Sequence, residues 1–335
     1  MRICLVRIDK MGDMILTLPI IQGLKKANNN CKIDVVCSQR NLKICKKFNT
    51  INNIILFSSQ ILGIFQTIQK IRKENYDYIF TFSPGILSIF ISIFFRSKTK
   101  SLLILQSRYK NNFKSKLFER IIGKLFYKYS SVINRKKRFI EKNSIHQTEL
   151  MNELVKTSGL EIKDDEEIKN IFNLEKKDYG LKKLCLIHLS SKWLNKYFSE
   201  DRFINFIEKI KNFNINIVLT SDESSKNVFV KIYKKYDLYN DKQFKDLVSI
   251  NEIIILDNLN FNNWISIINS SSYVITPECG CTHIASLTSC KLCVIYDSDN
   301  SPDMIANEYA PWKKHYTKLL SNDKNLEEKL ISFIN

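Results

Sequence analysis

The stretch that decides the fold is MRICLVRIDKMGDMILTLPIIQGLKKANNNCKIDVVC, residues 1–37. Residues 2–8 and 32–37 are short apolar runs of the kind found in buried strands, and residues 14–27 carry apolar side chains at helical spacing. A strand, a helix and a second strand in this order make the beginning of a parallel sheet. We therefore predict an α/β protein.

The same alternation continues in both halves of the chain. Further strands are predicted at 54–57, 78–82, 101–105, 184–188, 215–219, 252–256, 272–276 and 292–296, and helices at 61–73 and 86–95. A polar, charged stretch at 142–179 separates the halves and is the predicted domain junction. The pattern predicts two Rossmann-like, doubly wound domains facing a central cleft, residues 1–160 and 161–335. The last helix is a candidate for packing back on the first domain.

The net charge of +18, from 52 Lys and Arg against 34 Asp and Glu, favours an anionic partner. The excess is concentrated between Arg108 and Lys142, which hold 12 basic and 2 acidic residues. No nucleic-acid-binding motif accompanies this charge, so a nucleic acid ranks last among the partners considered.

The cysteines and the chain start predict a cytoplasmic protein with reduced thiols. No secretory signal precedes the first strand, and several of the nine cysteines lie in apolar runs. The longest apolar run, Gly85 to Phe95, is too short to span a bilayer. A zinc site was considered because His and Cys residues gather late in the chain, but their spacing fits no common zinc motif, so no metal is expected. These residues are Cys279, Cys281, His283, Cys290 and Cys293.

Residues 113–128 are predicted to form an amphipathic helix with an apolar stripe and basic flanks. The stripe consists of Phe113, Leu117, Phe118, Ile121, Ile122, Leu125 and Phe126. Lys116, Lys124 and Lys128 are the candidate contacts to an anionic membrane. The alternative is an ordinary helix that packs its stripe on the sheet.

The first candidate site is the loop after the first strand, RIDKMGDMILTLP, residues 7–19. Asp9, Gly12 and Asp13 follow the carboxyl end of a predicted strand, where reactive groups of such sheets usually lie. Pro19 is tolerated only near a helix start, so a helix is expected to begin close to Thr17. From spacing alone, a helix cap is the favoured role of Asp13.

The second candidate site is HLSSKWLNKYF, residues 188–198, again after a strand. Ser190 and Ser191 offer hydroxyl donors, and Lys192 and Lys196 offer positive charge, a combination that suits a diphosphate. The alternative is a solvated basic loop. His188 by itself is more typical of a core histidine than of a catalyst.

The third candidate site is TPECGCTHIASL, residues 276–287, between a strand and a helix. Gly280 allows a close approach of the backbone to a ligand, and the helix start presents N–H groups to an anion. Glu278 is an acceptor suited to sugar hydroxyls, or simply a favourable charge near a helix start. The GxGxxG, GxxxxGK[ST] and GxSxG motifs are absent, which removes the main support for dehydrogenase, P-loop and hydrolase activities.

Together the three segments resemble the bacterial lipopolysaccharide heptosyltransferase family over nearly the whole chain. The first motif is matched by Gly12, Asp13, Thr17 and Pro19, and a late Pro-Trp by Pro311 and Trp312. The middle motif is matched by His188, Ser191, Trp193 and Lys196, with Phe198 in place of a second Trp. The third is matched by Gly280, His283 and Ala285, with Glu278 and Cys279 replacing an Asp and a hydroxyl residue.

The resemblance implies an inverting, metal-independent glycosyltransferase of the GT-B type that uses ADP-heptose as donor and needs no cofactor. Asp13 would be the base on the acceptor hydroxyl, and Gly12 would support its loop. Ser190, Ser191, Lys192 and Lys196 would hold the donor diphosphate. The turn with Glu278, Cys279, Gly280, Cys281 and His283 would hold the donor sugar and nucleotide.

The acceptor implied by the resemblance is the lipopolysaccharide or lipooligosaccharide core, an anionic glycolipid on the inner face of the bacterial inner membrane. The departures at Glu278, Cys279 and Phe198 leave a transferase for another nucleotide sugar as an alternative. A catalytically inactive module that binds a nucleotide or a glycan is the alternative from another class.

Overall fold

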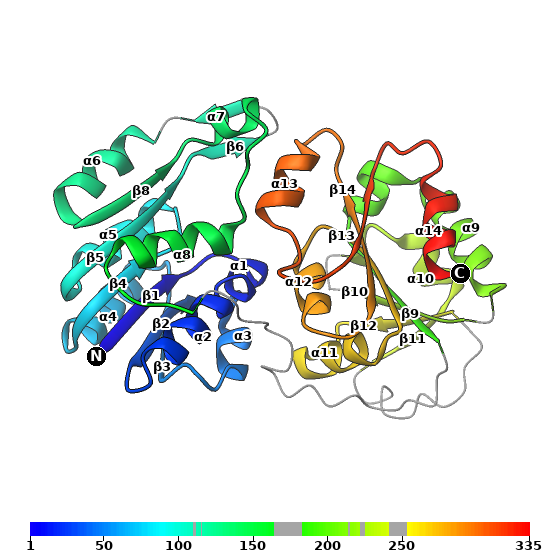
Figure 1. Ribbon diagram of the computed structural model, residues 1–335. Helices are drawn as coiled ribbons and strands as arrows, with labels where there is room; N and C mark the ends of the chain where they lie inside the picture. The colour runs from blue at the N-terminus through cyan, green and yellow to red at the C-terminus, as the bar shows by residue number, and fades with distance from the viewer. Residues whose placement is uncertain (110–111, 115, 164–182, 214, 222–224, 241–252) are drawn as a thin grey trace. The chain divides into compact units, whose positions relative to one another are not determined.

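The computed structural model describes residues 1–109, 112–114, 116–163, 183–213, 215–221, 225–240 and 253–335 (Figure 1). Chain contacts divide it into two units, Met1–Ile168 with Asp303–Trp312, and Lys169–Pro302 with Lys313–Asn335. Each unit is built on one parallel sheet with helices on both faces, so the α/β architecture with two parallel-sheet domains is confirmed. The division falls in a stretch that the structure does not describe, and the boundary at 160/161 stays a prediction.

The sheet of the first unit has the strand order β3-β2-β1-β4-β5-β8, with every neighbouring pair parallel. Its strands are β1 (Arg2–Arg7), β2 (Lys32–Ser38), β3 (Asn53–Phe57), β4 (Asn75–Thr81), β5 (Arg96–Leu105) and β8 (Tyr129–Ile133). The chain runs outward from β1 to β3 and then returns to β4 on the other side of β1. Ligands of doubly wound sheets bind where the order reverses, here at the carboxyl ends of β1 and β4.

Helices cover both faces of this sheet. One face carries α2 (Leu18–Ala27), α3 (Leu42–Lys47) and α8 (Gln147–Thr157), and the other carries α4 (Ile61–Arg72), α5 (Ile86–Ile93) and α6 (Leu117–Phe126) (Figure 1). The first unit also contains two short helices, α1 (Met11–Ile15) and α7 (Arg135–Ile140), and an antiparallel pair of strands, β6 (Ser107–Tyr109) and β7 (Asn112–Lys114).

Three local predictions needed correction in the first unit. The predicted helix 14–27 is two helices: α1 ends at Ile15, and α2 starts at Leu18 with Pro19 in its first turn, as expected for Pro. The predicted helix 113–128 is shorter, and its first residues lie in β7. The stretch 142–179 is not only a junction: α8 lies in it, with a buried stripe that includes Leu150, Met151 and Leu154.

The sheet of the second unit has the order β11-β12-β10-β9-β13-β14-β15, also parallel throughout. Its strands are β9 (Leu184–His188), β10 (Asn216–Ser221), β11 (Asp237–Tyr239), β12 (Ile253–Asp257), β13 (Tyr273–Pro277), β14 (Lys291–Tyr296) and β15 (Thr317–Leu320). The strand order reverses between β9 and β13. The expected ligand position is therefore at the carboxyl ends of these two strands.

The core of the second unit lies mainly under α9 (Glu200–Lys211), α10 (Val230–Lys235) and α14 (Leu326–Ile334). The other face carries α11 (Phe261–Ser270) and α12 (Gly280–Ser286). The π-helical turn η1 (Trp193–Tyr197) precedes α9. The last helix, α14, packs on α9 and β15, and the segment that rejoins the first unit is instead Asp303–Trp312, which contains most of α13 (Pro302–Glu308). None of the described helices is long and apolar enough to cross a membrane.

Candidate functional site

The loop after β1 brings two carboxylates, Asp9 and Asp13, to one buried guanidinium, that of Arg7. Arg7 is 1% exposed because it points from the last residue of β1 under this loop. Its Nη2 donates to Asp13 Oδ1 at 3.2 Å, and its Nη1 lies 3.5 Å from Asp9 Oδ2. Nη1 also donates to the carbonyl oxygen of Phe82, directly after β4, at 2.5 Å. Arg7 thus ties the ends of β1 and β4 together at the reversal point of the sheet.

Asp13 is held at both carboxylate oxygens and remains accessible. Its Oδ2 accepts the backbone N–H of Lys10 at 3.1 Å, so the capping role considered from the sequence is present in α1. The side chain is 22% exposed, and Thr17 Oγ1 donates to the Asp13 carbonyl oxygen at 2.8 Å. Gly12 is buried beside it in α1. Capping and Arg7 together fix the orientation of a carboxylate that solvent can still reach.

Asp9 lies in the same loop, with a side chain that is 30% exposed, and has a different environment. Its Oδ2 accepts a hydrogen bond from Ser83 Oγ at 2.7 Å. Desolvation by burial raises the pKa of Asp9 above its ordinary value, and the nearby Asp13 charge raises it further, against the lowering effects of Arg7 and the Ser83 hydroxyl. Sequence reasoning placed Asp9 in this loop but gave no role to Arg7 or Ser83; a basic residue ending a buried strand was the available signal.

In the second unit, the loop after β9 presents Ser190, Ser191 and Lys192 at the carboxyl edge of the sheet. Trp193 anchors the loop, since it is fully buried and its Nε1 donates to the His188 carbonyl oxygen at 2.9 Å. Ser190 is half-buried and Ser191 exposed. Lys196 belongs to η1, but its side chain lies outside what the structure describes, so its predicted diphosphate contact stays a prediction.

Lys192 crosses from the β9 loop to the turn after β13. Its Nζ donates to Glu278 Oε2 at 2.9 Å and to the Glu278 carbonyl oxygen. The two side chains are 40% and 27% exposed. The second and third sequence segments are therefore brought together at the point where the strand order of this sheet reverses.

The turn after β13 exposes some of its residues and buries the others. Glu278, Cys279 and Gly280 are half-buried. Cys279 is the N-cap residue of α12, and its backbone N–H donates to Thr282 Oγ1 at 3.2 Å. Cys281 and His283 are 1% and 4% exposed and face the interior of the unit. Burial raises the pKa of the Cys281 thiol well above its ordinary value. Only the first three residues of the turn lie where a ligand could touch their side chains or backbone.

A polar cluster that the sequence did not reveal lies at the ends of β10 and β12. Asp257 Oδ1 accepts from Ser221 Oγ and from Tyr233 OH, each at 3.0 Å, and Lys226 Nζ is 2.5 Å from Asp257 Oδ2. The signal that could have indicated it is an acidic residue directly after the apolar run 253–256. His188, by contrast, is satisfied as expected for a structural histidine, with Nδ1 3.1 Å from Thr220 Oγ1.

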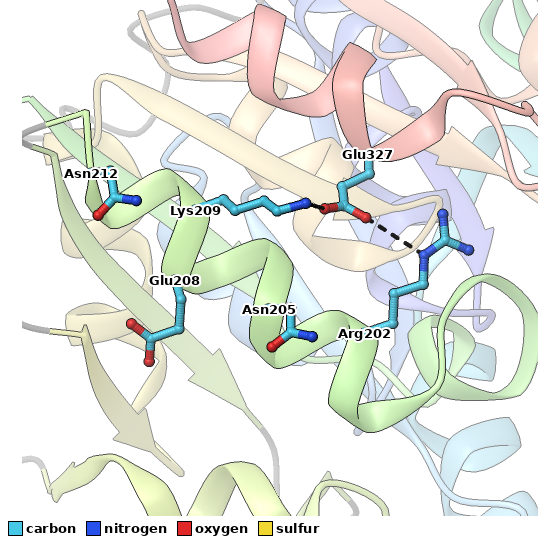
Figure 2. Close-up of a pocket in the computed structure, with 6 residues that line it drawn as sticks. All are labelled: Arg202, Asn205, Glu208, Lys209, Asn212 and Glu327. Atoms are coloured by element: carbon cyan, nitrogen blue, oxygen red, sulfur yellow. Dashed lines mark hydrogen bonds and ion pairs between the residues drawn. The ribbon is translucent and has the colours of Figure 1, made fainter.

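A surface cavity of about 420 Å³ lies away from these strand ends (Figure 2). Its lining comes from α9, its C-cap Asn212 and α14, and Glu327 there pairs with Lys209 and Arg202 at 2.6 and 3.5 Å. It contains no residue of the three sequence segments. Among the described residues, no three His, Cys, Asp or Glu side chains are grouped as metal ligands.

Comparison with known proteins gives one family. The sequence profile of glycosyltransferase family 9 (heptosyltransferase) matches residues 64–331, which include the second and third segments but not Asp13. Among curated proteins, none matches the chain significantly.

Several solved structures share the fold at low sequence identity. The E. coli heptosyltransferase WaaC with ADP matches with a TM-score of 0.74 at 14% identity, covering 100% of this chain and 99% of that one. The E. coli ADP-heptose lps heptosyltransferase II matches at 0.70 and 12%, covering 100% and 98%. A family 9 glycosyl transferase from Veillonella parvula matches at 0.68 and 14%, covering 95% and 85%.

Proposed function

This chain belongs to glycosyltransferase family 9, the heptosyltransferase family, and on that premise we propose that it transfers heptose from ADP-heptose to a lipopolysaccharide or lipooligosaccharide core, with Asp13 as the base. It is a glycosyltransferase with two parallel-sheet α/β domains like those of GT-B heptosyltransferase structures. The WaaC structures contain ADP and an ADP-2-deoxy-2-fluoro heptose, which supports a nucleotide-sugar donor for the present chain.

The observation that carries the role of Asp13 is its position at the reversal point of the first sheet. A general base must be accessible and oriented. Asp13 is 22% exposed, and Arg7 and the Lys10 N–H fix its two oxygens. We propose that one of these oxygens takes the proton of the acceptor hydroxyl.

The bond changes of the proposed transfer balance without a cofactor. The acceptor oxygen, as it loses its proton to Asp13, forms a bond to the anomeric carbon of the donor sugar. The bond from that carbon to the diphosphate oxygen breaks, and ADP leaves with the electron pair. Attack opposite the leaving group inverts the anomeric centre. Positive charge and N–H donors near the diphosphate stabilise the charge that develops there.

We assign the diphosphate to the β9 loop and the sugar and nucleotide to the β13 turn. Ser190, Ser191 and Lys192 offer hydroxyl and ammonium donors at one sheet edge, and Lys196 is retained from the resemblance. Lys192 already contacts Glu278, so the same two segments would share the donor. Cys281 and His283 are better explained as interior supports of the turn, since both are buried. Glu278, Cys279 and Gly280 would make the contacts.

The departures from the family motifs differ in weight. Phe198, which replaces a Trp, is 4% exposed and stacks on Phe206 with ring centres 5.8 Å apart, so this change lies in the core. Glu278 and Cys279 lie on the half-exposed part of the turn, where a change would meet the donor. They favour, as the second candidate, a transferase of the same kind with another nucleotide sugar.

The donor is tested by thermal shift of the whole chain with ADP, GDP, UDP and CMP. Stabilisation by ADP above the other nucleotides is expected, because a ligand that binds only the folded state raises its melting temperature. A preference for UDP, GDP or CMP would support the second candidate. No stabilisation by any nucleotide would contradict the whole proposal.

The base is tested with Asp13→Asn, which keeps the size and the capping oxygen of the side chain. We expect kcat for heptose transfer to fall by about 10²- to 10⁴-fold, the usual contribution of a general base, with an unchanged ADP thermal shift. The exposed Asp237→Asn serves as the matched control. Undiminished transfer by Asp13→Asn would contradict Asp13 as the base. A wild type that binds the nucleotide but shows no transfer would instead support the inactive nucleotide- or glycan-binding module.

The acceptor would bring the enzyme to the membrane. We propose a cytoplasmic, peripheral location on the inner face of the inner membrane, with an anionic glycolipid as partner. The exposed Lys124 and Lys128 remain candidate contacts to the anionic membrane surface. Lys116 is a weaker candidate, because its side chain is only 16% exposed and its Nζ lies 2.5 Å from Glu119 Oε1.

A further inference from the structure

Helix α5 of the first unit differs from an ordinary surface helix: it exposes large apolar side chains and buries its two serines along with Ile89 and Ile91. Its polar residues Ser88 and Ser92 are fully buried, whereas Ile86, Leu87 and Phe90 are exposed, Phe90 by 48%. At about 100° per residue, the exposed side chains cover one continuous arc, which Phe94 at the C-cap extends. A surface helix normally turns its polar face to water. The outward face of α5 is therefore suited to an apolar environment.

Both buried serines have hydrogen-bond partners, so their burial is part of the fold. Ser88 Oγ donates to the carbonyl oxygens of Ser83 and Gly85 at 2.7 and 2.6 Å. Ser92 Oγ donates to the Ile89 carbonyl oxygen at 2.9 Å and also bonds the hydroxyl of the buried Tyr127. These hydrogen bonds offset the cost of taking the two hydroxyls out of water, so the burial of the serines does not oppose this orientation of α5.

Helix α6 continues the same apolar surface. The sequence left open whether its stripe packs on the sheet, and the structure leaves Leu117, Ile121 and Leu125 exposed, Leu125 by 71%. The helix instead approaches the sheet through Gly123, where an added Cβ would lie 3.3 Å from Ile104 Cδ1. Helices α5 and α6 contact each other on one face of the sheet (Figure 1).

We name as the α5–α6 surface the exposed side chains of Leu87, Phe90, Phe94, Leu117, Ile121 and Leu125. Large apolar side chains exposed together on two helices that contact each other are typical of an interaction site. Basic residues border it: Arg120 and Lys124 lie along one edge of the α6 stripe at helical spacing, and Lys128 follows the helix, all exposed. The acidic Glu119 is buried and paired with Lys116.

We propose that the α5–α6 surface docks the chain on an anionic lipid bilayer, with the apolar side chains among the acyl chains and the basic border at the headgroups. The basic border selects this occupant. In a symmetric dimer formed through the same surface, Arg120 and Lys124 of both copies would approach one another, and like charges across an interface oppose association. An anionic interface instead attracts each of them.

The position of α5 gives the docking a consequence for the reaction, and here the inference rests on the proposed function. Ser83 connects the two, because its carbonyl oxygen accepts from Ser88 of α5 and its hydroxyl donates to Asp9 of the β1 loop. Helix α5 therefore starts beside the carboxyl ends of β1 and β4, where the loop after β1 leads to Asp13. Docking through α5 would bring the headgroup layer close to the base, so that a membrane-anchored hydroxyl could reach it.

The test is flotation of the whole chain with vesicles, without donor or acceptor. Wild type is compared on vesicles of phosphatidylethanolamine with phosphatidylglycerol and on vesicles of phosphatidylcholine alone. The apolar variant is Leu87→Ser/Phe90→Ser and the charge variant Arg120→Glu/Lys124→Glu. Matched controls in the second unit are Val230→Ser/Leu238→Ser and Lys211→Glu/Lys234→Glu, which change exposed residues of the same kinds.

Wild type and both controls are expected to bind the anionic vesicles, and each α5–α6 variant to bind at least tenfold more weakly. The charge variant should also lose most of the salt dependence. All variants should keep the ADP thermal shift and transfer to a soluble, delipidated acceptor, which separates failed docking from failure of the proposed function. Absence of anionic-vesicle binding, or variants that bind like wild type, would overturn the proposal. So would a dimer in sedimentation equilibrium that Leu87→Ser/Phe90→Ser dissociates.

Discussion

Arg7 donates hydrogen bonds to three oxygen atoms around the first site, one from each of its three guanidinium nitrogens. Nη2 donates to Asp13 Oδ1, Nε to the Asp13 carbonyl oxygen at 3.3 Å, and Nη1 to the Phe82 carbonyl oxygen. A lysine keeps the charge but lacks the planar fork that makes these contacts together. Arg7 is thus a positioning residue for the proposed base.

Arg7→Lys is expected to lower kcat for transfer by about tenfold or more, since small displacements of a catalytic group have large effects on rate. KM for the donor and the ADP thermal shift should stay close to wild type, because Arg7 lies in the first unit and the proposed donor residues lie in the second. A merely structural role would change stability and leave kcat of the folded fraction unchanged. Steady-state kinetics at a temperature well below the melting transition distinguishes the two.

Asp9 gives a pH dependence of stability. Its pKa is raised in the folded state, chiefly by desolvation. An acid with a raised folded pKa contributes stability that is fully present below its unfolded pKa, about 3.9, and that is lost as pH rises through the folded pKa. Asp9→Asn removes this loss. Urea unfolding across the acidic range should therefore show the variant gaining on wild type as pH rises, and a constant difference at every pH would refute the assignment.

At the scale of elements, α2 is fixed against the chain that follows α8 by a glycine. An added Cβ at Gly23 would lie 2.9 Å from Ile162 Cγ1 and closer still to the carbonyl oxygen of Lys163. The Lys163 N–H also donates to the Gly23 carbonyl oxygen at 3.2 Å. The helix and this segment approach more closely than any side chain allows.

Gly23→Ala is therefore expected to destabilise the protein by about 1–3 kcal/mol, the usual cost of overpacking, although Ala is the better helix former. Urea unfolding measures the loss. The exposed Lys26→Ala in the same helix is the control and should change stability by less than about 0.5 kcal/mol. A stabilised Gly23→Ala would show that the close approach is absent in solution.

At the scale of the whole molecule, the chain leaves the first unit and returns to it with Asp303–Trp312. The returning segment is held by Arg135, which contacts Glu308 at 2.8 Å and the Tyr309 hydroxyl at 2.6 Å. His146 bonds the Ala310 carbonyl oxygen at 3.1 Å and lies beside the Trp312 ring. The late Pro-Trp motif is thus part of the first unit, at its buried contact with α7 and α8.

Glu308→Ala is expected to destabilise the first unit by about 3–5 kcal/mol, because it leaves the guanidinium of Arg135 buried without its carboxylate. The side chains of Glu308 and Arg135 are only 2% and 11% exposed. Asp201→Ala, which breaks the exposed pair with Lys231, should have a much smaller effect. Equal losses in the two variants, measured by urea unfolding, would rule out the buried pair as a major support of the returning segment.

The sequence by itself determined the central strands and the loops that follow them. Strands buried on both faces are continuous apolar runs, and such runs indicated β1, β2, β9, β13 and β14 within a residue or two. Edge strands such as β8 and β15 lack that pattern and were not predicted, since one side of each meets solvent. Pro19, which is tolerated only near a helix start, likewise located the start of α2 close to Thr17.

Only the tertiary structure decided which side chains meet and which face of a helix is outside. The guanidinium of Arg7 reaches Asp13 because β1 and β4 are neighbours, and Lys192 reaches Glu278 because β9 and β13 are. The apolar run at 86–95 indicated a helix without its orientation, and the structure buries Ser88 and Ser92 of α5 while Ile86, Leu87 and Phe90 are exposed. Contacts between residues far apart in the chain carry no local sequence signal, because strand order and helix orientation arise from packing of the whole unit.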